Sequence, residues 1–357
     1  MTNPRWTRRP QGSTWGDWGP DDQLGRLNLL TPEKVLQGIA EVKIGENFCL
    51  SLPLDYPGGQ IINPRRPPPE LRPTMREGKP NMNVPLRCFD PLALDVICDD
   101  QVLLTLQYST QWDSLAHVGQ MFDVDGDGKP EDVYYNGYRA GVDIIGPVVW
   151  DEKGRDTPTA SGKHVGATHL GVENMAASCV QGRAVMIDLE AHFGRSGKVV
   201  GYEDWMAVLE KDRVVVEPGD MVCIRTGFAQ LLLDMKKQPD RDVLFNTTSA
   251  LDGRDDRLLQ WITDSGAVAM LADNYAVEAQ PARPGPLSSN GTGDPCASLP
   301  LHAHCLFKLG CYLGEMWYHT ELADWLRAHG RNRFLLTAPP LRLPGAVGSP
   351  ATPVATV

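Results

Sequence analysis

The sequence has no apolar run long enough to cross a membrane. A spanning helix needs about 18 or more successive apolar residues, and no stretch of the 357 residues approaches that length. The start MTNPRWTRRPQGSTWGDWG has basic residues but lacks the apolar segment of a secretory signal. We therefore expect a cytoplasmic protein that does not associate with membranes.

Basic residues are also scarce. The chain has 34 Lys and Arg against 45 Asp and Glu, a net charge of −11 at pH 7. Nucleic-acid surfaces need clustered Lys and Arg, so no nucleic-acid partner is expected. A small anionic substrate is not excluded, because a local field is set by the groups of the site.

Paired cysteines are absent. The eight cysteines are scattered, and no two form a C-x-x-C pair. Without a secretion signal, such cysteines are typical of reduced, buried small apolar residues. A disulfide framework is therefore not expected.

Several common catalytic motifs are missing as well. There is no G-x-S-x-G elbow, no G-x-G-x-x-G after a strand, no phosphate-binding P-loop and no H-E-x-x-H. These absences argue against an α/β-hydrolase serine, a nucleotide site and a zincin metalloprotease. The remaining candidates for chemistry are dispersed His, Asp and Glu residues.

From residue 164 onward the pattern alternates between helices and buried strands, which predicts an α/β domain with a mixed sheet. We expect one domain over residues 1–344 and a disordered tail over 345–357, where small residues and prolines dominate. Earlier, Thr31-Pro32 predicts a helix start, and the prolines of residues 57–85 predict a long surface loop or lid. Predicted helices cover residues 31–42, 169–178, 203–209, 255–265, 298–310 and 320–329, and predicted strands cover 46–55, 183–190, 221–227, 267–273 and 333–341.

An acidic segment resembles half of a calcium-binding loop. Asp123, Asp125, Asp127 and Gly128 match the D-x-D-x-D-G start of an EF-hand, but the twelfth position is Tyr134 instead of Glu. No helical pattern flanks the segment. A polar hairpin turn is the better interpretation.

The stretch LTLQYSTQWDSLAH, residues 104–117, alternates polar and mostly apolar residues. This period of two predicts a strand over 104–112. Asp113 is a good helix N-cap, with His117 at the end of a first helical turn.

Near the other end of the chain, His302 and His304 lie two apart on a predicted helix, so at most one of them should face a common site. Glu315 follows in a short extended piece.

The chain resembles the cyclase family of metal-dependent hydrolases, which includes bacterial kynurenine formamidase, isatin hydrolase and the trans-dienelactone hydrolases. The family motif H-x-G-T-H-x-D-x-x-x-H aligns with QYSTQWDSLAH, from Gln107 to His117. Four further blocks match in order, namely WGPDDQLGRLNLLTPEKV, VEPGDMVCIRTG, LADNYAVE and PLHAHCLFKLGCYLGEMW. The resemblance implies a single α/β domain of the swivelling β/β/α type and a homo-oligomer.

The chain departs from this motif at the first two histidines, which are Gln107 and Gln111 here. An amide oxygen is a far poorer zinc ligand than imidazole, so the first of the two family metal sites should be lost. The second set survives as Asp113, His302 and Glu315, with Gln111 as a supporting ligand. The resemblance thus implies one divalent ion, zinc first and manganese second.

The resemblance also implies roles and a reaction. His117 would be the general acid and base beside a metal-activated water, and Gln107 and Trp112 would contact the substrate. We expect a hydrolase that opens a small cyclic ester of the dienelactone kind. Two alternatives stay open, an amidase of the arylformamidase or isatin-hydrolase kind and a non-catalytic binding protein on a decayed hydrolase scaffold. Further candidates are His164, His169, Tyr135 and Glu278.

Overall fold

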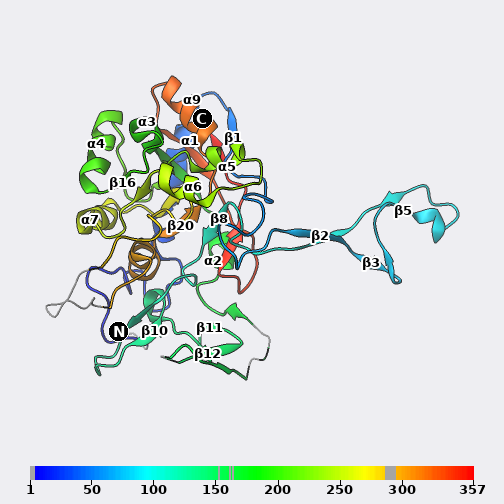
Figure 1. Cartoon of the computed structure of the whole chain (residues 1–357), viewed down its shortest axis with the longest axis horizontal. Helices are drawn as coiled ribbons and strands as arrows, with labels where there is room; N and C mark the ends of the chain where they lie inside the picture. Colours follow the sequence, from blue (N-terminus) through cyan, green and yellow to red (C-terminus); the bar gives the residue numbers. More distant parts are fainter. Residues whose placement is uncertain (1–4, 152, 161, 163–164, 286–294) are drawn as a thin grey trace.

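A nine-stranded mixed sheet forms the centre of the computed structural model, which describes residues 5–151, 153–160, 162, 165–285 and 295–357 (Figure 1). The strands at its middle run parallel, and the outer pairs are antiparallel. This confirms the expected α/β domain with a mixed sheet. In spatial order the strands are β1 (Asn47–Cys49), β23 (Val354–Thr356), β21 (Arg333–Thr337), β15 (Gln181–Asp188), β17 (Met221–Arg225), β19 (Ala269–Ala272), β20 (Tyr312–Glu315), β8 (Gln111–Asp113) and β22 (Gly348–Pro350).

Helices cover the sheet, so its parallel strands are buried almost throughout. Strands buried on both faces appear in sequence as continuous apolar runs, which is why β15, β17 and β19 could be predicted. The helices are α1 (Pro32–Ala40), α2 (Val172–Ala177), α3 (Leu189–Phe193), α4 (Tyr202–Asp212), α5 (Phe228–Asp234), α6 (Arg241–Thr247), α7 (Asp256–Ser265), α8 (Pro300–His302) and α9 (Thr320–Ala328), and a π-helix, η4 (Ala303–Leu309), continues α8. Short 3-10 turns are η1 (Gly25–Leu29), η2 (Leu86–Cys88) and η3 (Tyr135–Gly137).

Capping residues set helix ends where the sequence indicated them. The Thr31 side chain accepts a hydrogen bond from the Lys34 amide, and Pro32 opens α1. Gly310 ends η4 in the left-handed region, with φ +58°, a conformation that favours glycine. Gly310 therefore reverses the chain between the helix that carries His302 and the strand that carries Glu315.

The expected disorder of residues 345–357 is wrong. Residues 348–350 form β22 beside β8, with Ser349 opposite Trp112, and residues 354–356 form β23 beside β21, with Ala355 opposite Leu336. Ala355 is fully buried. Small residues have little strand preference alone, but here two buried neighbouring strands supply the pairing and the packing.

Outside the central sheet and the arm of residues 70–103, the described residues form four two-stranded sheets. In one of them, β9 (Gln120–Phe122) and β10 (Glu131–Val133) form a hairpin around the acidic segment. The predicted polar hairpin turn at Asp123–Gly128 is therefore confirmed. The other pairs are β11 (Ile144–Ile145) with β14 (Gly166–Ala167), β12 (Val148–Trp150) with β13 (Asp156–Pro158), and β16 (Val199–Val200) with β18 (Ala250–Leu251).

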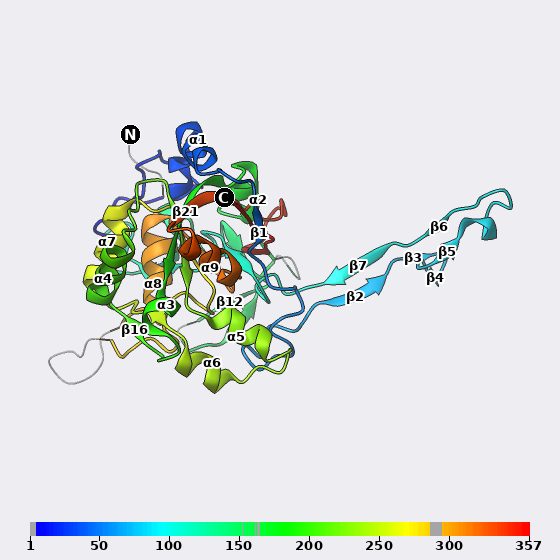
Figure 2. The same cartoon turned by 90° about the horizontal axis from the view of Figure 1, so that it is seen from above.

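A long arm, residues 70–103, projects from the body (Figures 1 and 2). Its strands are β2 (Glu70–Pro73), β3 (Met75–Arg76), β4 (Lys79–Pro80), β5 (Val84–Pro85), β6 (Val96–Ile97) and β7 (Asp100–Leu103), paired β2 with β7, β3 with β4 and β5 with β6. Part of this arm falls in the proline-rich segment expected to be an irregular loop. Proline is tolerated because it lies at strand ends, in ribbons whose edges have no further strand to pair.

Two other expectations need correction. The strand predicted over 104–112 is shorter, because residues 106–110 form turns and bends and only Gln111–Asp113 enter the sheet. Five of the eight cysteines are exposed, whereas only Cys223, Cys305 and Cys311 are buried as expected; all eight are free thiols.

No helix within the described residues is both long and apolar enough to cross a membrane.

Candidate metal centre

Two adjacent antiparallel strands bring three polar side chains together. β8 pairs with β20 so that Gln111 lies opposite Glu315. Alternation along β8 places Asp113 on the same face as Gln111. All three side chains are buried, with at most 3% of their surface exposed.

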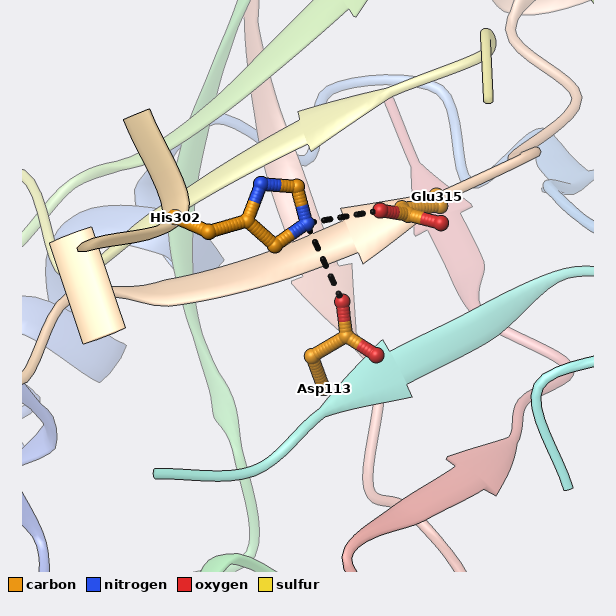
Figure 3. A group of neighbouring side chains, drawn as sticks. All are labelled: Asp113, His302 and Glu315. Atoms are coloured by element: carbon orange, nitrogen blue, oxygen red, sulfur yellow. Dashed lines mark hydrogen bonds and ion pairs between the residues drawn. The ribbon is translucent and has the colours of Figure 1, made fainter. Parts of the chain in front are cut away.

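His302 completes this group from α8 (Figure 3). Its Nε2 lies 3.1 Å from Oε1 of Glu315 and 4.0 Å from Oδ2 of Asp113. One nitrogen and two carboxylate oxygens, all within 4.8 Å of one another, form a compact set of potential metal ligands. The structure therefore brings together the Asp113, His302 and Glu315 set that the sequence predicted.

Glu278 holds His302 from the opposite side of the ring. Its Oε1 lies 2.7 Å from Nδ1 of His302. The backbone amides of Leu301 and His302 also donate to this carboxylate, at 3.0 and 3.1 Å. Because a carboxylate only accepts, the proton of this bond sits on Nδ1, and Nε2 is directed towards Asp113 and Glu315.

The charges of the group are strongly coupled. Burial lowers the pKa of His302, but hydrogen bonds to Glu278 and Glu315, with their charges, outweigh burial and raise that pKa to about 10. Burial raises the pKa of Asp113, and the charges of His117 and His302 offset this only in part. Burial is the largest influence on Glu315 and would raise its pKa, but the hydrogen bond from His302 together with the charges of His302, Arg66 and His117 outweighs burial and lowers it. The centre is thus an acidic pocket that holds one cationic ring when no metal is bound.

Two buried oxygens of this pocket lack hydrogen-bond partners among the described residues. They are Oε1 of Gln111 and Oδ2 of Asp113. The Gln111 amide nitrogen is occupied, since it donates to Glu315 at 2.9 Å. Buried polar atoms without partners are costly, and a cation between Oδ2 of Asp113 and Nε2 of His302, which lie 4.0 Å apart, would satisfy the carboxylate oxygen. The residues present therefore fit a divalent metal ion.

His117 lies at the outer edge of the group. Its Nε2 is 3.6 Å from Oδ1 of Asp113, and 21% of its side chain is exposed. The expected helix after Asp113 is absent, because residues 114–117 form a turn closed by a hydrogen bond from the His117 amide to the Ser114 carbonyl. A cleft of about 540 Å³ is lined by Val118 and Ala303, which follow His117 and His302 in sequence, but neither histidine lines it.

The structure does not bring Trp112 to the site. Its side chain is fully buried on the other face of β8, where it packs edge-on against Trp317 and donates to the Ala338 carbonyl. The expected substrate contact at Trp112 is wrong, because alternation turns it away from Gln111 and Asp113.

The Gln107 side chain packs against Gly348, where any Cβ would collide with the Gln107 amide. Gln107 thus lies next to the backbone that pairs with Asp113.

The other described residues that the sequence suggested for the site lie away from the centre. His304 points away from the centre and bonds to Thr263, as expected for one of two histidines two apart. His169 pairs with Asp143, and the Tyr135 hydroxyl bonds to Asp22, so neither reaches the centre. His164 lies outside the described residues. The acidic hairpin brings Asp123, Asp125 and Glu131 together at the surface, with Arg8 paired to Asp123.

Arg66 was missed by the sequence reasoning. It comes from the proline-rich segment, and its guanidinium donates to the Gln107 carbonyl at 2.7 Å. Its charge counteracts the effect of burial on the pKa of Asp113, which is still raised, and helps to lower the pKa of Glu315. An isolated arginine among prolines carries no local pattern, so only the tertiary structure reveals its place.

Comparisons with known proteins agree with this fold. The model of the Cyclase family matches residues 48–279, a range that contains β8 and Glu278 but ends before His302. A crystal structure described as a novel cyclase is 29% identical, with a TM-score of 0.70 over 97% of each chain. Isatin hydrolase A from Labrenzia aggregata is 13% identical (TM-score 0.52, 90% of this chain and 97% of that chain), and the Ralstonia solanacearum enzyme is 15% identical (TM-score 0.52, 87% and 91%). No curated protein matches the chain.

Proposed function

The chain belongs to the cyclase family, and from that premise we propose that it is a metal-dependent hydrolase that opens a small cyclic ester. The observation that carries the proposal is the compact buried group of Asp113, His302 and Glu315, in which Oδ2 of Asp113 has no hydrogen-bond partner among the described residues and lies 4.0 Å from Nε2 of His302. This arrangement is suited to one cation. The fold shared with isatin hydrolases supports a hydrolytic reaction.

Asp113, His302 and Glu315 would hold the ion, with the Gln111 amide oxygen as a weaker fourth ligand. Zinc is the first choice because it binds one imidazole and carboxylates with an open position, and manganese also accepts an oxygen-rich set. Bound there, a divalent ion would supply a Lewis acid that polarises a carbonyl and makes a neighbouring water more acidic. Only one ion is expected, since glutamine replaces both histidines of the other family site.

His117 would move the protons. It lies at the solvent-facing edge of the centre, where a water and a substrate carbonyl can approach it. The Asp113 carboxylate, 3.6 Å away, stabilises the imidazolium that forms when His117 takes a proton from the attacking water. The same imidazolium then protonates the leaving oxygen of the ring. His117 thus serves first as base and then as acid.

An ester suits this centre better than an amide does. An enolate or alkoxide is a far better leaving group than an amide anion, so one Lewis acid and one imidazole suffice. Arg66 adds a cation beside the centre, which favours a substrate with a carboxylate. The second candidate is the opening of a cyclic amide, favoured by the fold likeness to isatin hydrolase, whose substrate is a cyclic amide.

A substrate panel tests the proposal. Purified protein loaded with zinc or manganese is assayed against small lactones with and without a carboxylate, cyclic amides and N-formyl aromatic amines. We expect turnover of carboxylated lactones and one metal ion per chain by elemental analysis. Preferential turnover of amides would favour the second candidate. No turnover with either metal, or two ions per chain, would contradict the one-metal hydrolase.

A further inference from the structure

A cavity of about 230 Å³ lies near the carboxyl end of β19, because Asn274 and Tyr275, which follow this strand, line it. In open α/β sheets, ligands bind in the crevice outside the carboxyl ends of the strands. Glu278 also lines the cavity, whereas none of the proposed metal ligands does. The cavity is therefore a separate space that borders the metal centre at Glu278, the residue that holds His302.

Three residues that line this cavity each carry a buried polar atom with no hydrogen-bond partner in the described part of the chain. The atoms are Oγ of Ser249, Oδ1 of Asn274 and Nε2 of Gln280. Ser249 is fully buried, and Asn274 is 3% exposed. Buried polar atoms are nearly always hydrogen-bonded, so three such atoms around one cavity indicate a polar ligand.

The orientation of the Asn274 amide is set by its own hydrogen bonds. Its Nδ2 donates to the carbonyls of Ser249 and Val277, at 3.2 and 3.3 Å. Because both partners are acceptors, the amide oxygen cannot take the place of this nitrogen. Oδ1 of Asn274 is therefore available as an acceptor, the Ser249 hydroxyl can donate or accept, and the Gln280 amide can donate.

The loop that supplies Asn274 is held in a strained conformation. Ala276 and Val277 have φ values of +83° and +60°. The left-handed region is unfavourable for a β-branched side chain such as that of Val277. The Val277 carbonyl is held by the Leu251 amide, at 3.2 Å, as well as by Asn274. Strain of this kind concentrates at sites that clamp a ligand.

Aromatic rings form another wall of the cavity. Phe228 and Phe245 meet edge-on with 5.8 Å between their ring centroids, and Phe245 and Tyr275 meet in the same way at 5.7 Å. Aromatic side chains offer a large apolar surface that packs well against a ring of the ligand. Water alone would leave this wall without an apolar partner.

The two charged residues that line the cavity are already paired. Lys198 Nζ lies 2.9 Å from the carboxylate of Asp204, and Glu278 is bonded to His302. A charged ligand would lose its hydration without gaining a counter-ion. The cavity is also smaller than the about 300–1,000 Å³ of sites for drug-sized molecules. The ligand should therefore be small and uncharged.

We propose that this cavity binds a small uncharged ring compound that carries a carboxamide. A carboxamide offers a donor and an acceptor in one neutral group, which matches the acceptor of Asn274 and the donor of Gln280. The Ser249 hydroxyl can bond to either part of that group. The ring of the ligand packs against the aromatic wall. This binding does not depend on the proposed hydrolysis, because it uses none of the metal ligands.

Calorimetric titration of the metal-free full chain with benzamide tests the ligand class. Benzamide should bind at one site per chain. Acetophenone keeps the ring and the carbonyl but replaces the amide nitrogen by a methyl group, and benzoate has the same shape with a charge. Both should bind at least about tenfold more weakly, because Oδ1 of Asn274 would stay unpaired. Absence of benzamide binding at millimolar concentration, or equal affinity for acetophenone, would overturn the proposal.

Variants locate the bound benzamide. Ser249→Ala and Gln280→Met should each weaken its binding roughly tenfold, since each removes one hydrogen-bonding group. Both should fold, which circular dichroism verifies, because the atoms removed have no partner among the described residues. Gln260→Met, on the surface of α7 where the amide bonds to Asp264, is the matched control and should bind benzamide as the wild type does.

Two further results distinguish this cavity from other sites. His117→Ala, at the edge of the metal centre, should bind benzamide with unchanged affinity, and a crystal soaked in benzamide should show it between the aromatic wall and Asn274. Weaker binding in either folded cavity variant supports the site. Unchanged binding in both, loss of binding in His117→Ala, or a soaked crystal with water only in the cavity would overturn it.

Discussion

Glu278 and His302 are joined by a hydrogen bond of 2.7 Å on the ring nitrogen that faces away from the other two carboxylates. A carboxylate on one ring nitrogen is the arrangement that orients metal-binding histidines in proteins. It fixes the proton on Nδ1 and leaves Nε2 for the ion. Glu278 thus positions His302 without being a ligand.

Replacing Glu278 by Gln should weaken metal binding about 10- to 100-fold, the usual cost of removing such a supporting partner. The amide keeps its oxygen as an acceptor for Nδ1 and the His302 amide but loses the negative charge, and its nitrogen opposes the backbone amide of Leu301. Competition with a chromophoric chelator measures the affinity. Glu321→Gln, at an exposed position on α9, is the control and should leave it unchanged. Equal affinities in both variants would remove Glu278 from this role.

Metal affinity should rise with pH. Without metal, His302 has a pKa of about 10, so at neutral pH its ring is protonated and must lose that proton to bind an ion through Nε2. Each unit of pH below about 10 should therefore weaken apparent binding by up to about tenfold, with release of a proton on binding. Titrations at pH 6, 7 and 8, together with a pH indicator in weak buffer, measure both effects. An affinity independent of pH would mean that His302 is not a ligand.

Variants of the two histidines should separate metal binding from proton transfer. His302→Ala should lose both metal and turnover, because it removes a ligand from the group of three. His117→Ala should keep the metal and lose about 10²- to 10⁴-fold in rate, the usual contribution of a general acid–base. His329→Ala, at an exposed position, is the control for both. Loss of metal in His117→Ala would show that His117 is a ligand instead.

The ligand set could be predicted from the sequence because its members lie in blocks with recognisable order. The family motif located Asp113 and His117, and the block around His302 and Glu315 supplied the rest. The pattern could not show that Gln111 faces Glu315 directly, since that depends on the antiparallel register of β8 and β20. Alternation along the strand, by contrast, already places Trp112 on the face opposite Gln111 and Asp113, so its position away from the site could be predicted.

The C-terminal strands and the arm were beyond local reasoning for a different physical reason. β22 is Gly-Ser-Pro and β23 is only Val-Ala-Thr, segments too short to be recognised alone, and their strand conformation depends on pairing with β8 and β21. The arm combines prolines with exposed apolar residues, a composition that also suits an irregular loop. Conversely, the buried strands β15, β17 and β19 were found because burial on both faces leaves a continuous apolar signature.

Acid should destabilise the fold through two buried neutral histidines. Burial lowers the pKa of His319 to about 4 and that of His304 to about 3. Both folded-state values lie below the ordinary value of about 6.5 for an unfolded chain, so their contribution to stability is fully present above pH 6.5. As pH falls from about 6.5 towards 4, these histidines bind protons in the unfolded state but not in the folded state, so the free energy of unfolding declines.

For His319 alone this loss should approach about 3 kcal/mol at pH 4. Urea unfolding at pH 7 and pH 4 measures it in the wild type and in His319→Gln, whose amide can still donate to the Leu271 carbonyl that His319 Nε2 contacts. Carboxylates also titrate in this range, so the decisive quantity is the difference between the two proteins. The variant should lose less stability on acidification than the wild type, and His329→Gln, at an exposed position, should lose as much. Equal losses in His319→Gln and wild type would mean that His319 is protonated inside the folded protein, and that its Nδ1, which has no partner among the described residues, bonds to a buried acceptor such as water.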